Sequence, residues 1–101
     1  MNILVVEDNK STLKLLEKKI NVWGFPVHLA ENGVEALAKL ASTPIDMVLT
    51  DWNMPEMDGL EFCRRVRKSD MPYIYLIIVT GRDSRQDIVR GLESGADDYV
   101  T

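Results

Sequence analysis

Carboxylates and one hydroxyl follow the first, third and fourth apolar runs of the chain, at the points where those runs end. Glu7 and Asp8 follow the first run, Asp51 follows the third, and Thr80 ends the fourth. Carboxylates that crowd together repel one another unless a cation neutralises them, and oxygen ligands of this kind suit Mg²⁺. A carboxylate with a free oxygen can also act as a nucleophile toward a phosphoryl group. These residue types point to metal-assisted chemistry, and Asp51 is the first candidate for the reacting residue.

Each of these residues also has an ordinary structural explanation. Asp51 could be a turn residue after a strand, and either Glu7 or Asp8 could cap a helix. Thr80 could simply end its strand. The argument for a site therefore rests on the combination, because three separate strands each end in the required chemistry.

The apolar runs themselves predict a parallel sheet. The first run shows no alternation of apolar and polar residues, which is typical of a strand that is buried on both faces. The second is weaker and begins with a proline, which favours an edge strand. The expected strands are residues 3–6, 26–30, 47–51, 73–80 and 98–101.

Four helices are expected between the strands, because apolar residues recur there at three- and four-residue steps. Polar residues that favour helix starts precede them, and Gly24 and Gly95 mark two of the ends. The expected buried stripes are Leu13, Leu16, Ile20 and Trp23; Leu37, Leu40 and Ala41; Leu60, Cys63 and Val66; and Ile88, Val89 and Leu92.

Strict alternation of strands and helices predicts an α/β fold, a flavodoxin-like, doubly wound parallel sheet with strand order 2-1-3-4-5. In this order the first, third and fourth strands are neighbours, so the polar residues at their carboxyl ends meet at the topological switch point. Ligands of open α/β sheets bind at that edge. The topology therefore brings the candidate residues together.

Length and charge bound the class of protein. The 101 residues suffice for one small domain, and a net charge of −4 argues against direct binding of nucleic acid. No segment reads as a signal peptide or a membrane span, so the cytoplasm is the expected compartment. The single cysteine, Cys63, excludes an internal disulfide and is expected to fill the core.

Four motifs carry a resemblance to a known family. They read VVEDN at 5–9, LTDWNMPEMDG at 49–59, IVTG at 78–81 and GADDYV at 95–100. With them the chain resembles, over its whole length, the receiver domain of two-component response regulators. The resemblance implies that Asp51 accepts a phosphoryl group from a phosphohistidine of a sensor histidine kinase or phosphotransfer protein. It also implies a switch that regulates an output domain or partner.

The resemblance further implies roles for the surrounding residues. Asp8, Asp51 and the backbone carbonyl of Asn53 would bind Mg²⁺, and Glu7 would act through a metal-bound water. Thr80 would donate a hydrogen bond to a phosphoryl oxygen. The aromatic that turns inward when this threonine moves corresponds to Tyr99.

Three further residues flank the expected site. Trp52 is either a partly exposed lid or a packing residue, and Gly81 follows Thr80 directly. Arg82 either shields or contacts the phosphoryl group, or it is a solvated loop residue; family members tune the lifetime of that group at this place and at Asn53. The single histidine, His28, lies on the second strand and is expected to be structural.

The sequence departs from the family at its C-terminal end. Receivers carry a lysine just after the fifth strand and then a fifth helix, whereas this sequence ends at Thr101. We therefore expect residues 1–101 to be a receiver domain truncated before that lysine, with its output domain beyond residue 101. Self-association through the face left uncovered is expected, and so is poorer phosphorylation because the lysine normally pairs with the phosphoryl group.

Several functions compete at this stage. The favoured one is a phosphorylation-dependent switch, not an enzyme beyond slow autophosphorylation and autodephosphorylation. The alternative is a receiver-like module for interaction or dimerisation that has lost phosphotransfer. An aspartate-nucleophile phosphohydrolase is disfavoured because Asn53 stands where a general acid is needed. Flavin or nucleotide binding is disfavoured because residues 7–9 form an anionic loop.

Overall fold

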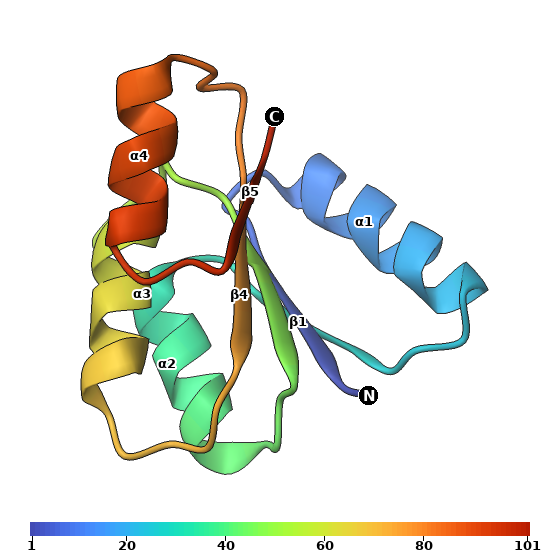
Figure 1. The fold of residues 1–101 in the computed structure, drawn as a ribbon. Coiled ribbons are helices and arrows are strands. Elements are labelled where there is room, and N and C mark those ends of the chain that lie inside the picture. The colour runs from blue at the N-terminus through green and yellow to red at the C-terminus, as the bar shows by residue number, and fades with distance from the viewer.

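Five parallel strands form a single sheet in the order β2-β1-β3-β4-β5, in a computed structural model that describes residues 1–101 (Figure 1). The predicted flavodoxin-like topology is therefore confirmed. The strands are β1 (Ile3–Val6), β2 (Val27–Ala30), β3 (Met47–Thr50), β4 (Tyr75–Val79) and β5 (Asp98–Val100). The helices are α1 (Lys10–Val22), α2 (Gly33–Ser42), α3 (Gly59–Lys68) and α4 (Arg85–Glu93).

Each helix begins at a polar side chain that accepts a hydrogen bond from the backbone N–H three residues later. This contact satisfies one of the N–H groups that a helix start leaves without a partner. It also fixes where each helix begins after its loop, including the three loops that carry the expected site residues. The capping residues are Asn9, Asn32, Asp58 and Ser84.

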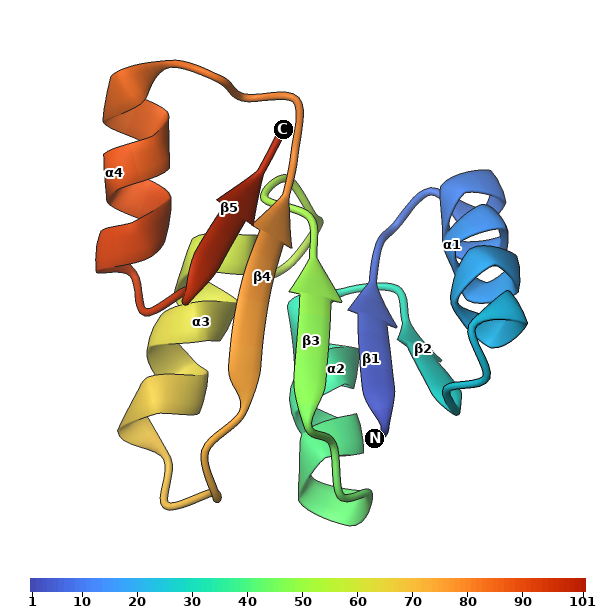
Figure 2. The same cartoon turned by 45° about the vertical axis from the view of Figure 1, so that its right-hand side comes forward.

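The two faces of the sheet are covered unequally. Helix α1 lies on one face, and α2, α3 and α4 lie on the other (Figures 1 and 2). The α2–α3 face holds a core of 17 buried residues, in which Phe62 and Cys63 of α3 are fully buried. Burial raises the pKa of the Cys63 thiol to about 11. The core on the α1 face has only four buried residues, and Met47 and Leu49 of β3 are partly buried there.

Some element boundaries differ from the prediction for identifiable reasons. Strand β4 starts at Tyr75 rather than at residue 73, because pairing with β3 begins at Tyr75. The carbonyl of Ile74, just before it, accepts a hydrogen bond from the Arg67 side chain instead. Strand β3 ends at Thr50, although the Asp51 N–H still donates to the Val6 carbonyl at 3.1 Å. The other strands differ from the prediction by at most one residue at an end.

Three predicted helix stripes were partly wrong. Trp23 is 68% exposed because α1 ends at Val22, one residue before it. In α2 the fully buried alanine is Ala36, whereas Ala41 is exposed. In α4 both Val89 and Leu92 are exposed, since this helix packs beside the edge strand β5 instead of over the middle of the sheet (Figure 2).

Candidate functional site

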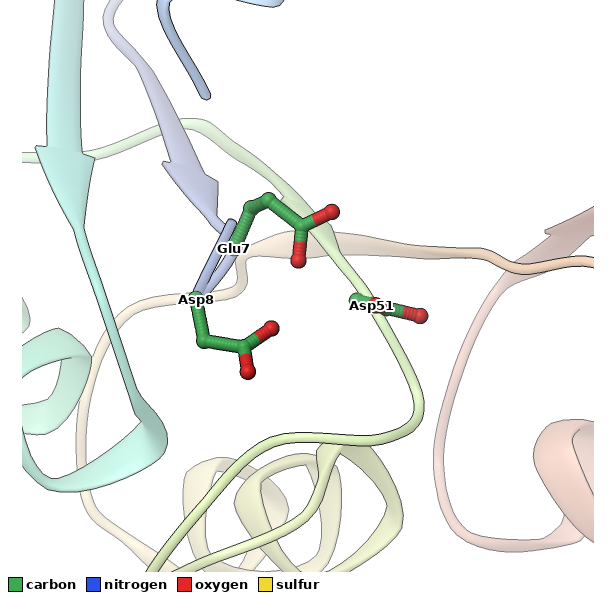
Figure 3. A group of neighbouring side chains, drawn as sticks. All are labelled: Glu7, Asp8 and Asp51. Atoms are coloured by element: carbon green, nitrogen blue, oxygen red, sulfur yellow. The ribbon is translucent and has the colours of Figure 1, made fainter. Parts of the chain in front are cut away.

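Three carboxylates converge at the carboxyl ends of β1 and β3. These strands are neighbours, and Val6 pairs with Thr50 in their register, so the residues that follow leave the sheet side by side. Figure 3 shows the side chains of Glu7 and Asp8 beside each other, extending toward Asp51. One oxygen from each lies within 4.8 Å of the others. The predicted acidic cluster is therefore present as a geometric unit.

The electrostatics of Glu7 show that this cluster is unsatisfied. Its Oε2 atom is buried and has no hydrogen-bond partner. Burial, together with the nearby negative charge of Asp51, raises the pKa of Glu7 from its ordinary 4.5 to about 7. A proton, a hydrogen-bond donor or a cation can compensate such an oxygen. A small cation that prefers oxygen ligands, such as Mg²⁺, fits this donor set.

Asp51 is held in place by its own loop. Its Oδ1 atom accepts a hydrogen bond from the Trp52 N–H at 2.7 Å, and the Thr50 hydroxyl donates to its carbonyl at 3.0 Å. The Gly59 N–H donates to the Trp52 carbonyl at 2.8 Å, which ties the loop to the start of α3. The second carboxylate oxygen of Asp51 takes part in none of these bonds.

Gly59 is a supporting residue of the site, and sequence reasoning gave it no role beyond its place at the end of the motif at 49–59. A Cβ atom at this position would overlap the carbonyl oxygen of Asp51. No larger residue therefore allows the loop to close so tightly behind the carboxylate. The sequence signal was a glycine directly after a helix-capping residue, Asp58, where the cap itself does not require one.

A cavity of about 350 Å³ opens beside the carboxylates on the α1 face. Its polar end is formed by Glu7, Asp51, Thr80 and Gly81, and its apolar walls include Leu16 and Leu49. Thr80 is half-buried just beyond β4, and its N–H donates to the Val100 carbonyl at 3.0 Å. Thr80 therefore shares one space with the carboxylates of Glu7 and Asp51, and the exposed Gly81 also lines it.

Trp52 is a packing residue rather than a lid, since only 3% of it is exposed. Two guanidinium groups approach its ring: the Cζ atoms of Arg82 and Arg90 lie 4.7 and 5.3 Å from the ring centroid. The ring of Tyr99 meets it edge-on, with centroids 6.3 Å apart. The indole therefore connects the loop that carries Asp51 with α4 and β5.

Arg82 connects the loop after β3 with the start of α4. Its Nη2 atom donates to the Asn53 Oδ1 at 3.2 Å, and its Nη1 atom lies 3.5 Å from the Asp87 Oδ2 in α4. Its backbone N–H also donates to the Thr80 hydroxyl oxygen at 3.4 Å. Sequence reasoning placed Arg82 at the site but missed its partner Asp87. Asn53 and Arg82, the two places at which family members tune the lifetime of the phosphoryl group, contact each other.

Tyr99 is half-buried between β5 and α4. Its hydroxyl donates to the Arg82 carbonyl at 2.8 Å, and burial, with Asp87 as the next cause, raises its pKa. This hydrogen bond links Arg82, in the loop after Thr80, to the edge strand β5. His28 lies on β2, where it pairs with Leu4 of β1, and it is outside the site, as expected.

The family model described as "Response regulator receiver domain" matches residues 3–101 of the chain. The chain belongs to this family. The response regulator MprA of Mycobacterium avium (strain 104) is 42% identical to this receiver domain, over 99% of the chain and 43% of the relative. The chain thus spans less than half the length of such curated relatives.

Solved structures agree with this assignment of the receiver domain. The Francisella response regulator 1452 receiver domain superposes with a TM-score of 0.91 at 32% identity, covering 97% of this chain and 80% of that one. Chemotaxis response regulator CheY4 of Vibrio cholerae gives 0.91 at 29% identity, covering 97% and 82%. None of the four helices combines the length and apolar character that crossing a membrane requires.

Proposed function

We propose that this receiver domain is a phosphorylation-dependent signalling switch, in which Asp51 accepts a phosphoryl group from a phosphohistidine. The donor is a sensor histidine kinase or a phosphotransfer protein, and the domain works in the cytoplasm. The observation that carries the proposal is the acidic cluster at the switch point of the sheet. A cluster with a buried, unpartnered Glu7 oxygen suits a cation and a transferring phosphoryl group better than it suits a purely structural role.

Mg²⁺ is the cofactor that fits this donor set. The carboxylates of Glu7, Asp8 and Asp51 and the backbone carbonyl of Asn53 would hold it. When bound, it supplies cancellation of the negative charge on the phosphoryl oxygens. The oxygen of Asp51 that its loop leaves free forms the new bond to phosphorus. The bond to the donor histidine breaks, and its electron pair stays with the histidine nitrogen.

Thr80 and Tyr99 convert this event into a change of conformation. The Thr80 oxygen accepts from the Arg82 N–H, so its own hydrogen remains able to donate to a phosphoryl oxygen. The added group carries about two negative charges and three acceptor oxygens, which favours a shift of Thr80 toward it. The space beside Thr80 then admits Tyr99, and an output domain or partner senses the altered β5 and α4 surface.

Intact mass spectrometry after incubation with phosphoramidate and Mg²⁺ tests the proposal. We expect an adduct of one phosphoryl group in the parent, and none in Asp51→Asn or in the parent with a chelator. Asp70→Asn, which changes an exposed aspartate in the α3–β4 loop, is the matched control and keeps the adduct. An adduct that survives Asp51→Asn would refute the assignment of the acceptor. The domain would turn over phosphodonors only slowly, as an acceptor and not as an enzyme.

A further inference from the structure

Helix α4 contains a buried glycine near its C-terminal end. Gly91 lies in the last turn of the helix, which runs from Arg85 to Glu93, and it is the only fully buried residue of that helix. Glycine is less favourable in a helix than any residue except proline, because its backbone loses the most freedom. Its backbone has ordinary helical geometry, so the helix itself does not require glycine here. The reason must lie in what packs against it.

The ring of Tyr99 occupies the space that a side chain at position 91 would fill. A Cβ atom on Gly91 would lie 2.6 Å from the Tyr99 Cδ2 and 2.7 Å from its Cε2. Carbon atoms that are not bonded pack at about 3.5–4.0 Å, so an alanine here and the ring in its present place exclude each other. The third neighbour, the Cδ1 atom of Ile78 at 3.3 Å, ends a flexible side chain that can shift slightly.

The ring is fixed on its other sides by residues of the site. Its edge-on contact is with Trp52, whose N–H holds the Asp51 carboxylate. Its hydroxyl bonds to the Arg82 carbonyl, two residues after Thr80. Position 91 therefore supplies a wall of this space that belongs to α4.

We propose that Gly91 is a positioning residue for Tyr99: its missing side chain forms the seat in α4 that holds the ring against Trp52 and Arg82. The inference rests on the proposed function, in which Tyr99 turns inward on phosphorylation of Asp51. The Tyr99 ring, held at Gly91, couples the phosphorylation of Asp51 to the position of α4. A side chain at 91 displaces the ring and weakens that link in both directions, since coupling between two sites is reciprocal.

A double-mutant cycle tests the seat without any phosphoryl chemistry. Gly91→Ala displaces the ring, lowers the midpoint of thermal unfolding, and shifts Trp52 emission and the Tyr99 ring signals in NMR spectra. In a Tyr99→Ala background the same change raises the midpoint, because only the better helix propensity of alanine remains. Gln86→Ala, on an exposed position of α4, controls for propensity and leaves the ring signals unchanged. Unchanged ring signals in Gly91→Ala, or a destabilisation that persists without the Tyr99 ring, overturn the proposal.

Binding of beryllofluoride with Mg²⁺, a mimic of the phosphoryl group, tests the link to Asp51. Bound fluoride is followed by ¹⁹F NMR, so that changes at Trp52 do not enter the readout. We expect Gly91→Ala to change the affinity at least about fivefold, the lower end of ordinary coupling between sites, and Gln86→Ala to leave it unchanged. Equal affinity in Gly91→Ala and the parent overturns the link. Failure of the parent itself to bind refutes the proposed function, while the cycle above still decides the seat.

Discussion

Asp97 and Glu7 are half-buried acids at opposite ends of the sheet, and their surroundings differ. The Oδ2 atom of Asp97 accepts from Arg67 at 2.6 Å and from the Leu76 N–H at 2.8 Å, and its Oδ1 atom bonds to the Tyr73 hydroxyl. Burial opposes its ionisation, but these donors and the Arg67 charge together lower its pKa. The Oε2 atom of Glu7 has no donor, and burial with the nearby charge of Asp51 raises the pKa of Glu7 to about 7.

The difference separates a carboxylate that stabilises the fold from one that is available for chemistry. Asp97 joins the start of β5 to α3 and to the start of β4, because Arg67 also donates to the carbonyls of Gly95 and Ile74 at 2.8 and 2.7 Å. All its oxygens are used. The Glu7 carboxylate is also half-buried, but one of its oxygens has no partner. That oxygen is a cost to the metal-free fold that a ligand can remove.

Removing the charge of Asp97 has the largest expected effect on stability. Asp97→Asn leaves the Arg67 guanidinium without its carboxylate, so we expect the free energy of unfolding to fall by about 2–3 kcal/mol. Urea unfolding measures it, and Asp70→Asn is the control. The phosphoryl adduct at Asp51 should persist wherever the variant is folded. A loss below about 0.5 kcal/mol, the usual limit for surface changes, would contradict this role.

Adding Mg²⁺ should stabilise the folded domain through the acidic cluster of Glu7, Asp8 and Asp51. Binding to the folded state alone contributes RT ln(1 + [Mg²⁺]/Kd), about 1.4 kcal/mol at ten times Kd. The thermal midpoint of the parent should therefore rise with Mg²⁺, and that of Asp8→Asn should rise less at the same concentrations. Asp97→Asn, although less stable, should show the full increment of the parent. An equal response of Asp8→Asn and the parent would exclude Asp8 from the metal site.

The two acids should give stability opposite dependences on pH. The folded-state pKa of Glu7 is raised, so its favourable contribution is complete below pH 4.5 and is lost as pH rises through about 7. Allowing for solvent screening, metal-free stability should fall by about 1 kcal/mol over this window. Glu7→Gln should abolish that fall. Asp97 has a lowered pKa, so its contribution is lost only as pH falls below its ordinary value. A parent whose stability is flat between pH 4.5 and 7 would argue against the unsatisfied state of Glu7.

Neutralising Asp51 should have the smallest effect on the free energy of unfolding. The effect should be opposite in sign to that of neutralising Asp97. Asp51→Asn removes the charge that repels Glu7 but keeps an oxygen for the Trp52 N–H. We expect metal-free stability at pH 7 to rise by about 0.5 kcal/mol. The Glu7 titration, followed by carboxyl ¹³C NMR, should move toward its ordinary value. A destabilised Asp51→Asn would mean that this carboxylate supports the fold in a way that resembles Asp97.

Sequence reasoning anticipated the acidic cluster around Glu7 better than the hydrogen-bond network around Asp97. The acids at 7, 8 and 51 could be placed because parallel strands bring their carboxyl ends together, whatever the side-chain details. Arg67 and Asp97 lie 30 residues apart and could be paired only once α3, β4 and β5 were packed. For the same reason the start of β4 at Tyr75 could not be read from β propensity.

Side-chain environment was the second limit of the prediction. Trp52 could be a lid or a packing residue until its burial under Arg82 and Arg90 was known. The apolar pattern of α4 predicted burial for Val89 and Leu92, but the position of that helix beside the edge strand leaves them exposed. Periodicity shows that a helix has an apolar side and does not show what covers it.

The buried thiol of α3 gives the protein an internal reporter of its own opening. Cys63 is fully buried, and its pKa of about 11 keeps it protonated and unreactive near neutral pH. A thiol reagent can label the single cysteine only when the α2–α3 core opens. The labelling rate therefore reports how often this core opens, and the measurement needs no added dye or engineered site.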